Sequence, residues 1–551
     1  MEMAIKKIVF LFLITLLLQS CFKGEHADLI LHNGNIVTMD QNNPVTEAIA
    51  IRDGKIIDIG KERQILNKYT ADEIIDLNLA TVYPGFIDAH CHFIGYGLSE
   101  QMVKLTGVTS EEDMVSRCLD YQKSSGKNWI VGRGWDNTKW TDQSFPTYDL
   151  INKTFPDNPV LLRRIGGHGA LANQKALDLA GIDASTQING GYIEVIDGKL
   201  TGFIMDNAVD SILAVIPKPT LDDKKEAVLI AQKKCFELGL TTVDDAGLNK
   251  EDVELLQKME QDSLLKMKVY IMLSDNEENF KHYIDNGSGP IRTDLLNIGG
   301  VKFYGDGALG IRSACLLRPY ADATDSSSYG FLLHHPDYFF EKAQKVHAAG
   351  LQMCTHCIGD SAARIVLDAY GKVLGGANDL RWRIEHAQVI DANDFEKFRA
   401  YSIIPSVQPT HATSDMDWAI KRLGKNRVRF GYAYADLLMQ NGMIALGTDF
   451  PIERINPIET FYAAVARKKK DGTPKNGFQL ENALTREEAL RGMTFWAAMS
   501  NFEEKNKGSI EIGKDADLVV LSQDLLSVPE ESILKTYVLY TFVNGECVYE
   551  N

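Results

Sequence analysis

The stretch Tyr83-Pro84-Gly85-Phe86-Ile87-Asp88-Ala89-His90-Cys91-His92 has the pattern of a buried strand that ends in two histidines. Side chains alternate between the two faces of a strand, so Asp88, His90 and His92 share one face. A His-x-His pair at a strand end brings two imidazole nitrogens to one point, as a metal at the mouth of a barrel requires. Two ordinary histidines near a strand end are the competing interpretation, which would prevail if this motif stood alone.

Four further strand-like segments end in or carry polar side chains suited to the same site. Residues 351–356 and 381–386 each end in a histidine, and residues 443–449 bring a carboxylate to the end of an apolar strand. The apolar run at 297–304 contains a lysine, a residue that is rarely buried without a reason. Together these segments give six candidate metal-site residues: His90, His92, Lys302, His356, His386 and Asp449.

These residues, in this order, resemble the metal-dependent amidohydrolase superfamily, and within it the subgroup related to N-substituted formamide deformylase (amidohydrolase family 3, YtcJ-like). The resemblance runs from about residue 28 to the C-terminus. It is carried by PGFIDAHCH at 84–92, GWD at 134–136, GHGALAN at 167–173, GVKFYGDGALGIRSA at 300–314, THCIGD at 355–360, RIEHAQ at 383–388, QPTH at 408–411 and GTDFP at 447–451. The resemblance implies a (β/α)8 barrel, one or two divalent metals and hydrolysis at a carbon bonded to nitrogen.

The fold class that we predict is α/β, with a (β/α)8 TIM barrel over residues 84–507. Helical patterns separate most of eight strand candidates, the number that a closed barrel needs. The candidates are residues 82–90, 240–246, 267–273, 297–304, 351–356, 382–386, 402–408 and 443–449. The gap after the first strand is too long for one crossover, so residues 95–220 are expected to form an inserted subdomain over the barrel mouth.

Both ends of the chain are rich in short β-like runs. Turn signals such as Asn33-Gly34-Asn35 and Asp53-Gly54-Lys55 separate the runs near the N-terminus, and Asn544-Gly545 lies in the same pattern near the C-terminus. We therefore expect one small β-sandwich that is built from residues 28–83 and 508–551.

The resemblance leaves the number of metals open at one or two, with zinc as the first choice. The two histidines of the first strand would hold one metal, and those of the fifth and sixth strands a second. A free ammonium on Lys302 would be repelled by two dications, whereas the carbamate that several amidohydrolases form from lysine would bridge them. The alternatives for Lys302 are a neutral amine that contacts substrate beside a single metal, and a salt bridge to Asp306.

Asp449 is the expected catalytic residue. Coordination to a metal lowers the pKa of water from 15.7 to about 7, and Asp449 can accept the proton and pass it to a leaving nitrogen. The expected reaction is therefore attack by metal-bound hydroxide on a carbon–nitrogen bond other than a peptide bond: an amide, N-acyl, N-formyl or cyclic amide. A deaminase or a lactone or ester hydrolase on the same barrel is the alternative, followed by a non-catalytic solute-binding lipoprotein.

Six residues outside the metal set are candidates for contact with a small-molecule substrate. His168 and His411 stand in motifs that match the family and follow strand-like runs, while an ordinary surface or core histidine is the competing interpretation for each. The insertion and the loop after the fourth strand supply the remaining four candidates: Trp135, Asp136, Asp306 and Arg312.

The composition is that of an acidic globular protein. Of 551 residues, 45% are hydrophobic and 24% charged, which is enough apolar sequence for a barrel with additional domains. The formal net charge of −17 argues against nucleic acid as a partner, because a phosphate backbone is bound through clustered lysine and arginine. The oligomeric state is left open, with a homodimer as one option.

The N-terminus predicts export and a lipid anchor. Lys6 and Lys7 precede an apolar stretch at 8–18 that is too short to span a bilayer comfortably, so residues 1–20 are interpreted as a signal peptide. The sequence Leu18-Gln19-Ser20-Cys21 resembles a bacterial lipobox, in which the cysteine is lipidated and becomes the first mature residue. An uncleaved anchor with a chance cysteine is the alternative. Both place the enzyme in the bacterial cell envelope, outside the cytoplasm and held to a membrane, facing the periplasm or the cell surface.

Mass spectrometry of the mature N-terminus tests the lipid anchor. We expect an acylated Cys21, because the apolar core has signal-peptide length and ends at the lipobox-like sequence. A free N-terminus at another residue, or retention of Met1, would rule the anchor out.

Overall fold

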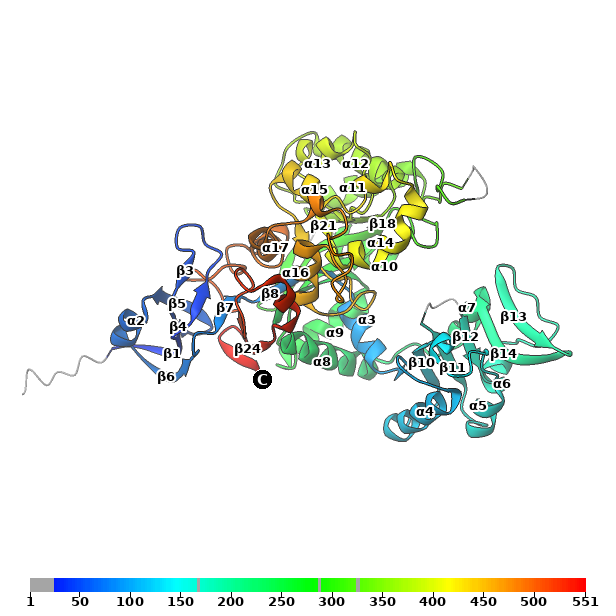
Figure 1. The fold of residues 1–551 in the computed structure, drawn as a ribbon. Coiled ribbons are helices and arrows are strands. Elements are labelled where there is room, and N and C mark those ends of the chain that lie inside the picture. Colours follow the sequence, from blue (N-terminus) through cyan, green and yellow to red (C-terminus); the bar gives the residue numbers. More distant parts are fainter. Residues whose placement is uncertain (1–23, 166–168, 286–288, 324–327) are drawn as a thin grey trace, which may run out of the picture. The chain divides into compact units, whose positions relative to one another are not determined.

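The computed structural model describes residues 24–165, 169–285, 289–323 and 328–551, so the predicted signal peptide and Cys21 lie outside the described residues. Within these ranges, eight parallel strands follow the order β8-β15-β16-β18-β19-β20-β21-β22 in a nine-stranded sheet, whose remaining strand β17 (Ile291–Arg292) pairs antiparallel with β18. Strands β8, β18 and β21 are labelled in Figure 1. The strands are β8 (Phe86–Cys91), β15 (Leu240–Leu248), β16 (Lys268–Ser274), β18 (Leu296–Tyr304), β19 (Gln352–Cys357), β20 (Arg383–His386), β21 (Ile404–Val407) and β22 (Ala445–Leu446). The predicted (β/α)8 barrel is therefore confirmed, although its last strand is only two residues long.

Contacts between β8 and the segment after β22 close the sheet. The backbone N–H and the hydroxyl of Thr448 donate to Asp88 at 2.9 and 2.7 Å, and the N–H of Asp449 donates to the carbonyl of His90 at 2.8 Å. Gly447 is required by close approach, since a Cβ there would lie 2.5 Å from the backbone nitrogen of His90. The seam of the barrel therefore runs directly beside the candidate metal-site residues.

Helices connect the barrel strands, and α12 (Asp360–Leu374) shows the sequence pattern that forms such a helix. Helix α12 buries Ala363, Val366, Leu367 and Tyr370, which recur at helical spacing and form one apolar face. The other helices of this part are α9 (Lys250–Gln261), α10 (Glu277–Asn279), α11 (Pro336–Ala348), α13 (Phe395–Ala400), α14 (Pro409–Leu423), α15 (Tyr434–Asn441), α16 (Pro457–Ala466), α17 (Arg486–Gly492) and α18 (Phe495–Ser500). In the parts of the chain that the structure describes, no helix is long and apolar enough to cross a membrane.

The two ends of the chain combine in a β-sandwich, as the sequence predicts. One sheet has the order β5-β4-β1-β6 and the other the order β25-β24-β23-β7-β2-β3. The N-terminal elements are β1 (Glu25–His32), β2 (Asn35–Val37), β3 (Val45–Thr46), β4 (Ala48–Arg52), β5 (Lys55–Gly60), α2 (Glu62–Lys68), β6 (Tyr69–Asp76) and β7 (Thr81–Pro84), and the C-terminal strands are β23 (Leu518–Leu521), β24 (Val538–Val543) and β25 (Glu546–Glu550). Leu31, Ile49, Leu518 and Phe542, from both ends of the chain, are buried in its core.

The insertion after β8 forms a compact unit of its own, at residues 94–231 against the predicted 95–220. Its sheet has the order β13-β14-β12-β11-β10-β9 and packs on short helices. Its elements are β9 (Val103–Lys104), α4 (Glu111–Ser125), β10 (Ile130–Trp135), η1 (Asn137–Lys139), α5 (Asp149–Thr154), β11 (Val160–Arg164), β12 (Gly169–Ala172), α6 (Gln174–Leu179), β13 (Gly191–Ile196), β14 (Lys199–Asp206) and α7 (Asn207–Leu213). The unit begins within helix α3 (Phe93–Glu100) and ends within helix α8 (Leu221–Glu237).

A buried lysine joins the barrel to the sandwich. Lys268, in β16, is 1% exposed, and its ammonium contacts Asp515 at 2.8 Å, Asp517 at 2.7 Å and the amide oxygen of Asn544 at 2.7 Å. Burial disfavours the charged form of Lys268, but the two carboxylates raise its pKa above the ordinary value. The three acceptors therefore keep the ammonium charged where it holds β16 against the C-terminal strands.

Replacing Lys268 with methionine should destabilise the protein strongly. The substitution leaves Asp515 and Asp517 without their buried partner, a change that typically costs about 3–5 kcal/mol. Urea unfolding measures the loss. Lys266→Met is the matched control, because Lys266 lies two residues away on the surface and forms an exposed ion pair with Glu546, so its change should stay within about 0.5 kcal/mol. Equal losses in the two variants would contradict this role.

Candidate metal centre

The six predicted metal-site residues meet at one end of the barrel. Each lies in a barrel strand or just after one: His90 in β8, His92 directly after it, Lys302 in β18, His356 in β19, His386 at the end of β20 and Asp449 after β22. The carboxyl ends of parallel strands meet at the same mouth of a barrel, so residues far apart in sequence come within contact distance.

Asp449 lies at the centre of this cluster. Its Oδ1 is 3.3 Å from Nε2 of His92 and 3.8 Å from Nε2 of His90, and its Oδ2 is 3.7 Å from Nε2 of His411. Two groups of donor atoms result, His90 with His92 and Asp449, and His386 with His411 and Asp449, each with all donor atoms within 4.8 Å of one another. Asp449 is common to both groups, so its carboxylate would be shared if each group held a metal.

The second group differs from the pairing that the sequence suggests. His411 was predicted only as a substrate contact, yet it lies in the first turn of α14 and its ring stacks on that of His386 with 5.8 Å between centroids. The ring of His356 lies 4.5 Å from that of His386, but its Nε2 is 3.3 Å from the carbonyl oxygen of Gly307. His411 therefore joins the candidate ligands, and His356 borders them.

Lys302 is buried beside the first group. It is 1% exposed, its Nζ lies 3.1 Å from Nε2 of His90, and it is 5.1 Å from the centroid of the Tyr304 ring. Burial lowers the pKa of Lys302. No carboxylate of the described residues forms an ion pair with Lys302, so the alternative of a salt bridge to Asp306 is wrong.

Burial also sets the protonation of the histidines. It lowers the pKa of His90 to about 4 and that of His356 to about 3, and it lowers the pKa of His386 well below 6.5. These imidazoles are neutral at pH 7, which is the form that binds a metal through a nitrogen lone pair.

The oxygen atoms of Asp449 fit a metal as well. Burial opposes ionisation of this carboxyl, but His92 and the other imidazoles hold its pKa well below 3.8. Oδ1 is buried and accepts no hydrogen bond from any residue that the structure describes, which is costly for a carboxylate without another partner. A cation at this point would remove that cost, so the donor set of neutral imidazoles and a carboxylate suits zinc or a similar divalent metal.

Two hydrogen bonds fix which nitrogen atoms face the centre. Nδ1 of His90 contacts Glu385, which in turn accepts a hydrogen bond from Arg383 at 2.7 Å. Burial raises the pKa of Glu385, but Arg383 and His90 outweigh it and hold this pKa well below 4.5. Nδ1 of His386 lies 2.7 Å from the amide oxygen of Gln408. Both partners occupy Nδ1 and turn Nε2 toward the cluster, as is usual for histidine ligands, and Nε2 of His90 also lies 3.1 Å from Nζ of Lys302.

Arg383, Glu385 and Gln408 are functional residues that the sequence motifs do not predict. All three lie in the stretches RIEHAQ and QPTH, in which only the histidines are predicted to have functions. The missed signal was the alternation Arg-x-Glu within a buried strand, because two charged side chains on one face of such a strand need a partner.

Asp306 and Arg312 have structural partners. Asp306 is buried and accepts hydrogen bonds from the backbone N–H groups of Cys315, Ile358 and Gly359 at 2.7–3.0 Å. Arg312 binds Asp322 through two nitrogen atoms at 2.9 and 3.1 Å. Both residues therefore order the loop after β18, and a direct contact with substrate stays a prediction for each.

The structure also gives the two candidates in the insertion a local role. Trp135 is fully buried in the core of that unit, and its indole N–H donates to the carbonyl of Leu162 at 2.8 Å. Asp136 caps η1 through Thr138 and pairs with Arg164 at 2.8 Å. His168 lies outside the described residues.

Comparison with known proteins gives a consistent result. The profile of the family Amidohydro_3, described as an amidohydrolase family, matches residues 73–549. The putative amidohydrolase YtcJ of Bacillus subtilis is 31% identical over 95% of this chain and 99% of its own length. The N-substituted formamide deformylase of Arthrobacter pascens is 27% identical over 95% of this chain and 98% of its own.

A solved structure extends the likeness to three dimensions. An uncharacterised metal-dependent hydrolase of Pyrococcus horikoshii OT3 is 29% identical, covers 91% of this chain and 99% of its own, and superposes with a TM-score of 0.76.

Proposed function

Since the chain belongs to the amidohydrolase family, and a similar protein of known structure is a metal-dependent hydrolase, we propose that it cleaves a carbon–nitrogen bond other than a peptide bond. The observation that supports this most directly is Asp449, whose buried Oδ1 makes no hydrogen bond among the described residues while two groups of histidines surround the same carboxylate. N-formyl and N-acyl amines are the first substrates to test, because one relative is a deformylase of N-substituted formamides.

The chain's own residues divide the work. His90, His92, His386 and His411 would hold one or two divalent metals, with Asp449 shared between them. A metal in this place would polarise the scissile carbonyl and lower the pKa of a water molecule. Asp449 accepts the proton of the attacking water and delivers it to the leaving nitrogen, which otherwise departs as a poor anionic group.

Lys302 is proposed to carry a carbamate. Its lowered pKa favours the neutral amine, which is the nucleophile that reacts with carbon dioxide, and the product would be an anion beside His90. The competing role is an unmodified neutral amine that contacts substrate beside one metal. Burial in a site without a carboxylate partner is compatible with both, so metal stoichiometry has to decide.

Two large side chains of residues near the centre are open to solvent and suggest what the substrate carries. The ring of Tyr304 lies 5.6 Å from that of His356 and remains 42% exposed. Ile452, whose backbone N–H donates to the carbonyl of Asp449, is 67% exposed. Large apolar side chains left open beside a polar centre are typical of a substrate site, so we propose that the substrate has an apolar substituent near the cleaved bond.

Elemental analysis of the Lys302→Ala variant tests the carbamate. We expect about two metals per chain in the unmodified protein and a clear loss in the variant, because an anionic bridge between two cations is removed. Mass spectrometry under native conditions should also find the added carbon dioxide on Lys302. One tightly held metal that is unaffected by the substitution would defeat the two-metal proposal while leaving the hydrolase intact.

Asp449→Asn tests the catalytic proposal. We expect kcat on an identified N-acyl or N-formyl substrate to fall by a factor on the order of 10² to 10⁴, the range of general acid–base catalysis, because the amide cannot accept the proton. Metal content and substrate-analogue binding should change far less. Asp417→Asn is the control, since Asp417 is exposed on α14 and forms a surface ion pair with Lys469. Near-normal kcat in Asp449→Asn with metal retained would end this assignment.

A further inference from the structure

A hollow lies beside the loops at the barrel mouth and outside the metal centre. Its volume is about 490 Å³, and it is formed by the loop at 389–393 after β20, the segment at 425–430 after α14, Arg318 of the loop after β18 and Asp360 at the start of α12. Four cationic side chains line it: Arg318, Lys425, Arg427 and Arg429. None of the four belongs to the candidate metal ligands.

Among the described residues, no carboxylate forms an ion pair with any of these four cations. Burial lowers the pKa of Arg427, and the carboxylate of Asp360 opposes this shift without pairing with it. The guanidinium of Arg427 donates to three backbone carbonyls, those of Leu423, Arg318 and Pro319, at 2.6–2.9 Å. Backbone carbonyls fix its position but do not neutralise its charge. Across the described ranges, neither Arg318, Lys425, Arg427 nor Arg429 forms an ion pair.

Of the two carboxylates in the same hollow, one pairs with an arginine outside it, and the other interacts with Arg427 at longer range than an ion pair. Asp391 pairs with Arg364 at 2.9 Å. Asp360 accepts a hydrogen bond from the backbone N–H of Leu317 at 2.8 Å, and burial raises its pKa. The hollow therefore carries an excess of positive charge in a protein whose formal net charge is −17.

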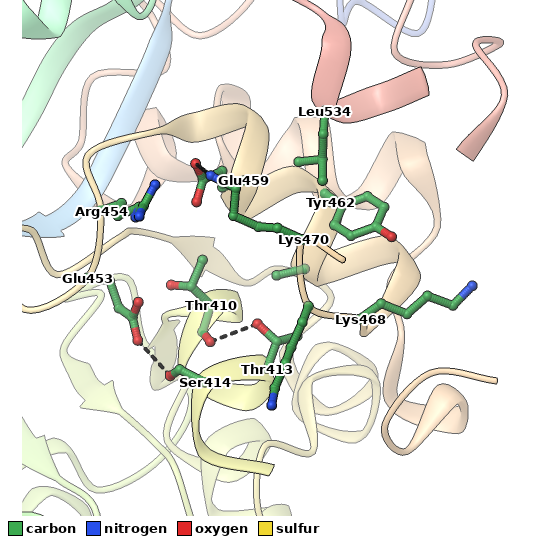
Figure 2. A pocket seen from close by; sticks show the side chains of 12 residues that line it. Thr410, Thr413, Ser414, Glu453, Arg454, Glu459, Tyr462, Lys468, Lys470 and Leu534 are labelled. Atoms are coloured by element: carbon green, nitrogen blue, oxygen red, sulfur yellow. Dashed lines mark hydrogen bonds and ion pairs between the residues drawn. The ribbon is translucent and has the colours of Figure 1, made fainter. Parts of the chain in front are cut away.

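A neighbouring pocket shows the ordinary arrangement of surface lysines. It has a volume of about 200 Å³ between α14, α16 and η5 (Glu530–Lys535), and Figure 2 shows Lys468 and Lys470 among its lining residues. Lys468 pairs with Glu530 at 2.6 Å, Lys470 pairs with Glu459 at 2.5 Å, and Lys469 pairs with Asp417. Each lysine there has its own carboxylate, which the cations of the larger hollow do not.

We propose that the hollow formed by Arg318, Lys425, Arg427 and Arg429 binds a multivalent oxyanion, namely a small molecule that carries phosphate groups. Guanidinium groups bind such oxygens through paired hydrogen bonds, and four cations suit a ligand with more than one negative charge. The volume lies within the range of small-molecule sites and exceeds that of a single phosphate. Arg427 supplies a fixed charge, the guanidinium of Arg429 lies 4.3 Å from the centroid of the Phe430 ring, and Arg318 and Lys425 complete the cationic lining.

The site is connected to the metal centre through the backbone. Its wall at 389–393 begins three residues after His386, and the N–H of Val389 donates to Ile358 while that of Ile390 donates to Phe430, at 3.0 and 3.1 Å. A bound oxyanion would therefore join the loops that follow two of the strands of the metal centre to the segment after α14. We infer that such a ligand steadies the mouth of the barrel.

Calorimetric titration of the purified metal-loaded protein with pyrophosphate, at low salt, tests the proposal. We expect saturable binding with one site per chain that weakens as sodium chloride is added, because surface charges are screened. The triple variant Arg318→Gln, Lys425→Gln, Arg429→Gln should lose roughly 10- to 100-fold in affinity, the effect of removing one or more charge-assisted hydrogen bonds. Arg427 is left in place because its carbonyl contacts hold the loop.

The triple variant Lys468→Gln, Lys469→Gln, Lys470→Gln is the matched control. It removes the same charge from the pocket of Figure 2 and should bind pyrophosphate as the unmodified protein does. Absence of binding overturns the proposal. Equal losses in both triple variants overturn it in favour of a general charge effect, and undiminished binding in the first triple variant overturns it in favour of the metal centre.

Discussion

The geometry of the metal centre depends on one buried cation, Arg383. Its guanidinium donates to Asp244 in β15 at 2.9 Å, to Glu385 in β20 at 2.7 Å, to the hydroxyl of Ser406 in β21 at 3.0 Å, and to the carbonyl of Ala89 in β8. Four barrel strands thus meet at one side chain that has no exposed surface. A buried guanidinium is tolerated only where its charge and its donors are matched, so the strands are held in one register by electrostatics as well as by the sheet. Glu385, which Arg383 holds in place, contacts Nδ1 of His90 and so fixes the orientation of that imidazole ring.

Backbone conformation at the site is also unusual. His386, Ala387 and Asp449 all have positive φ angles, at 71°, 40° and 61°. Non-glycine residues in this region are strained, and such strain persists only where surrounding contacts enforce it. At Asp449 the enforcing contact is the hydrogen bond from its N–H to the carbonyl of His90, which turns the carboxylate toward the histidines.

Much of the barrel and most of the cluster could be predicted from the sequence, for a simple physical reason. Parallel strands read as apolar runs, their carboxyl ends share one mouth, and a histidine or aspartate at such an end therefore points to a common site. His411 was not predicted as a metal ligand because it lies in helix α14, and the alternation of side chains along a strand does not place a helical residue. The structural roles of Trp135, Asp306 and Glu385 could not be predicted, because each depends on hydrogen-bond partners that are distant in the sequence. A sequence motif shows that a residue matters, but its partners show whether it binds a ligand or holds a loop.

The sandwich that closes on both ends of the chain has a consequence for biosynthesis. Val82 of β7 lies between β2, which pairs with it in parallel, and β23, where it meets Val520. Strand β7 therefore emerges from the ribosome with one edge open, and it keeps that edge until nearly the whole chain has been made. An open edge of a sheet is a site for mispairing with other chains. Completion of the last strands is thus the step that removes this hazard, and a chain cut short before β23 would retain a finished barrel sequence beside a sheet that cannot close.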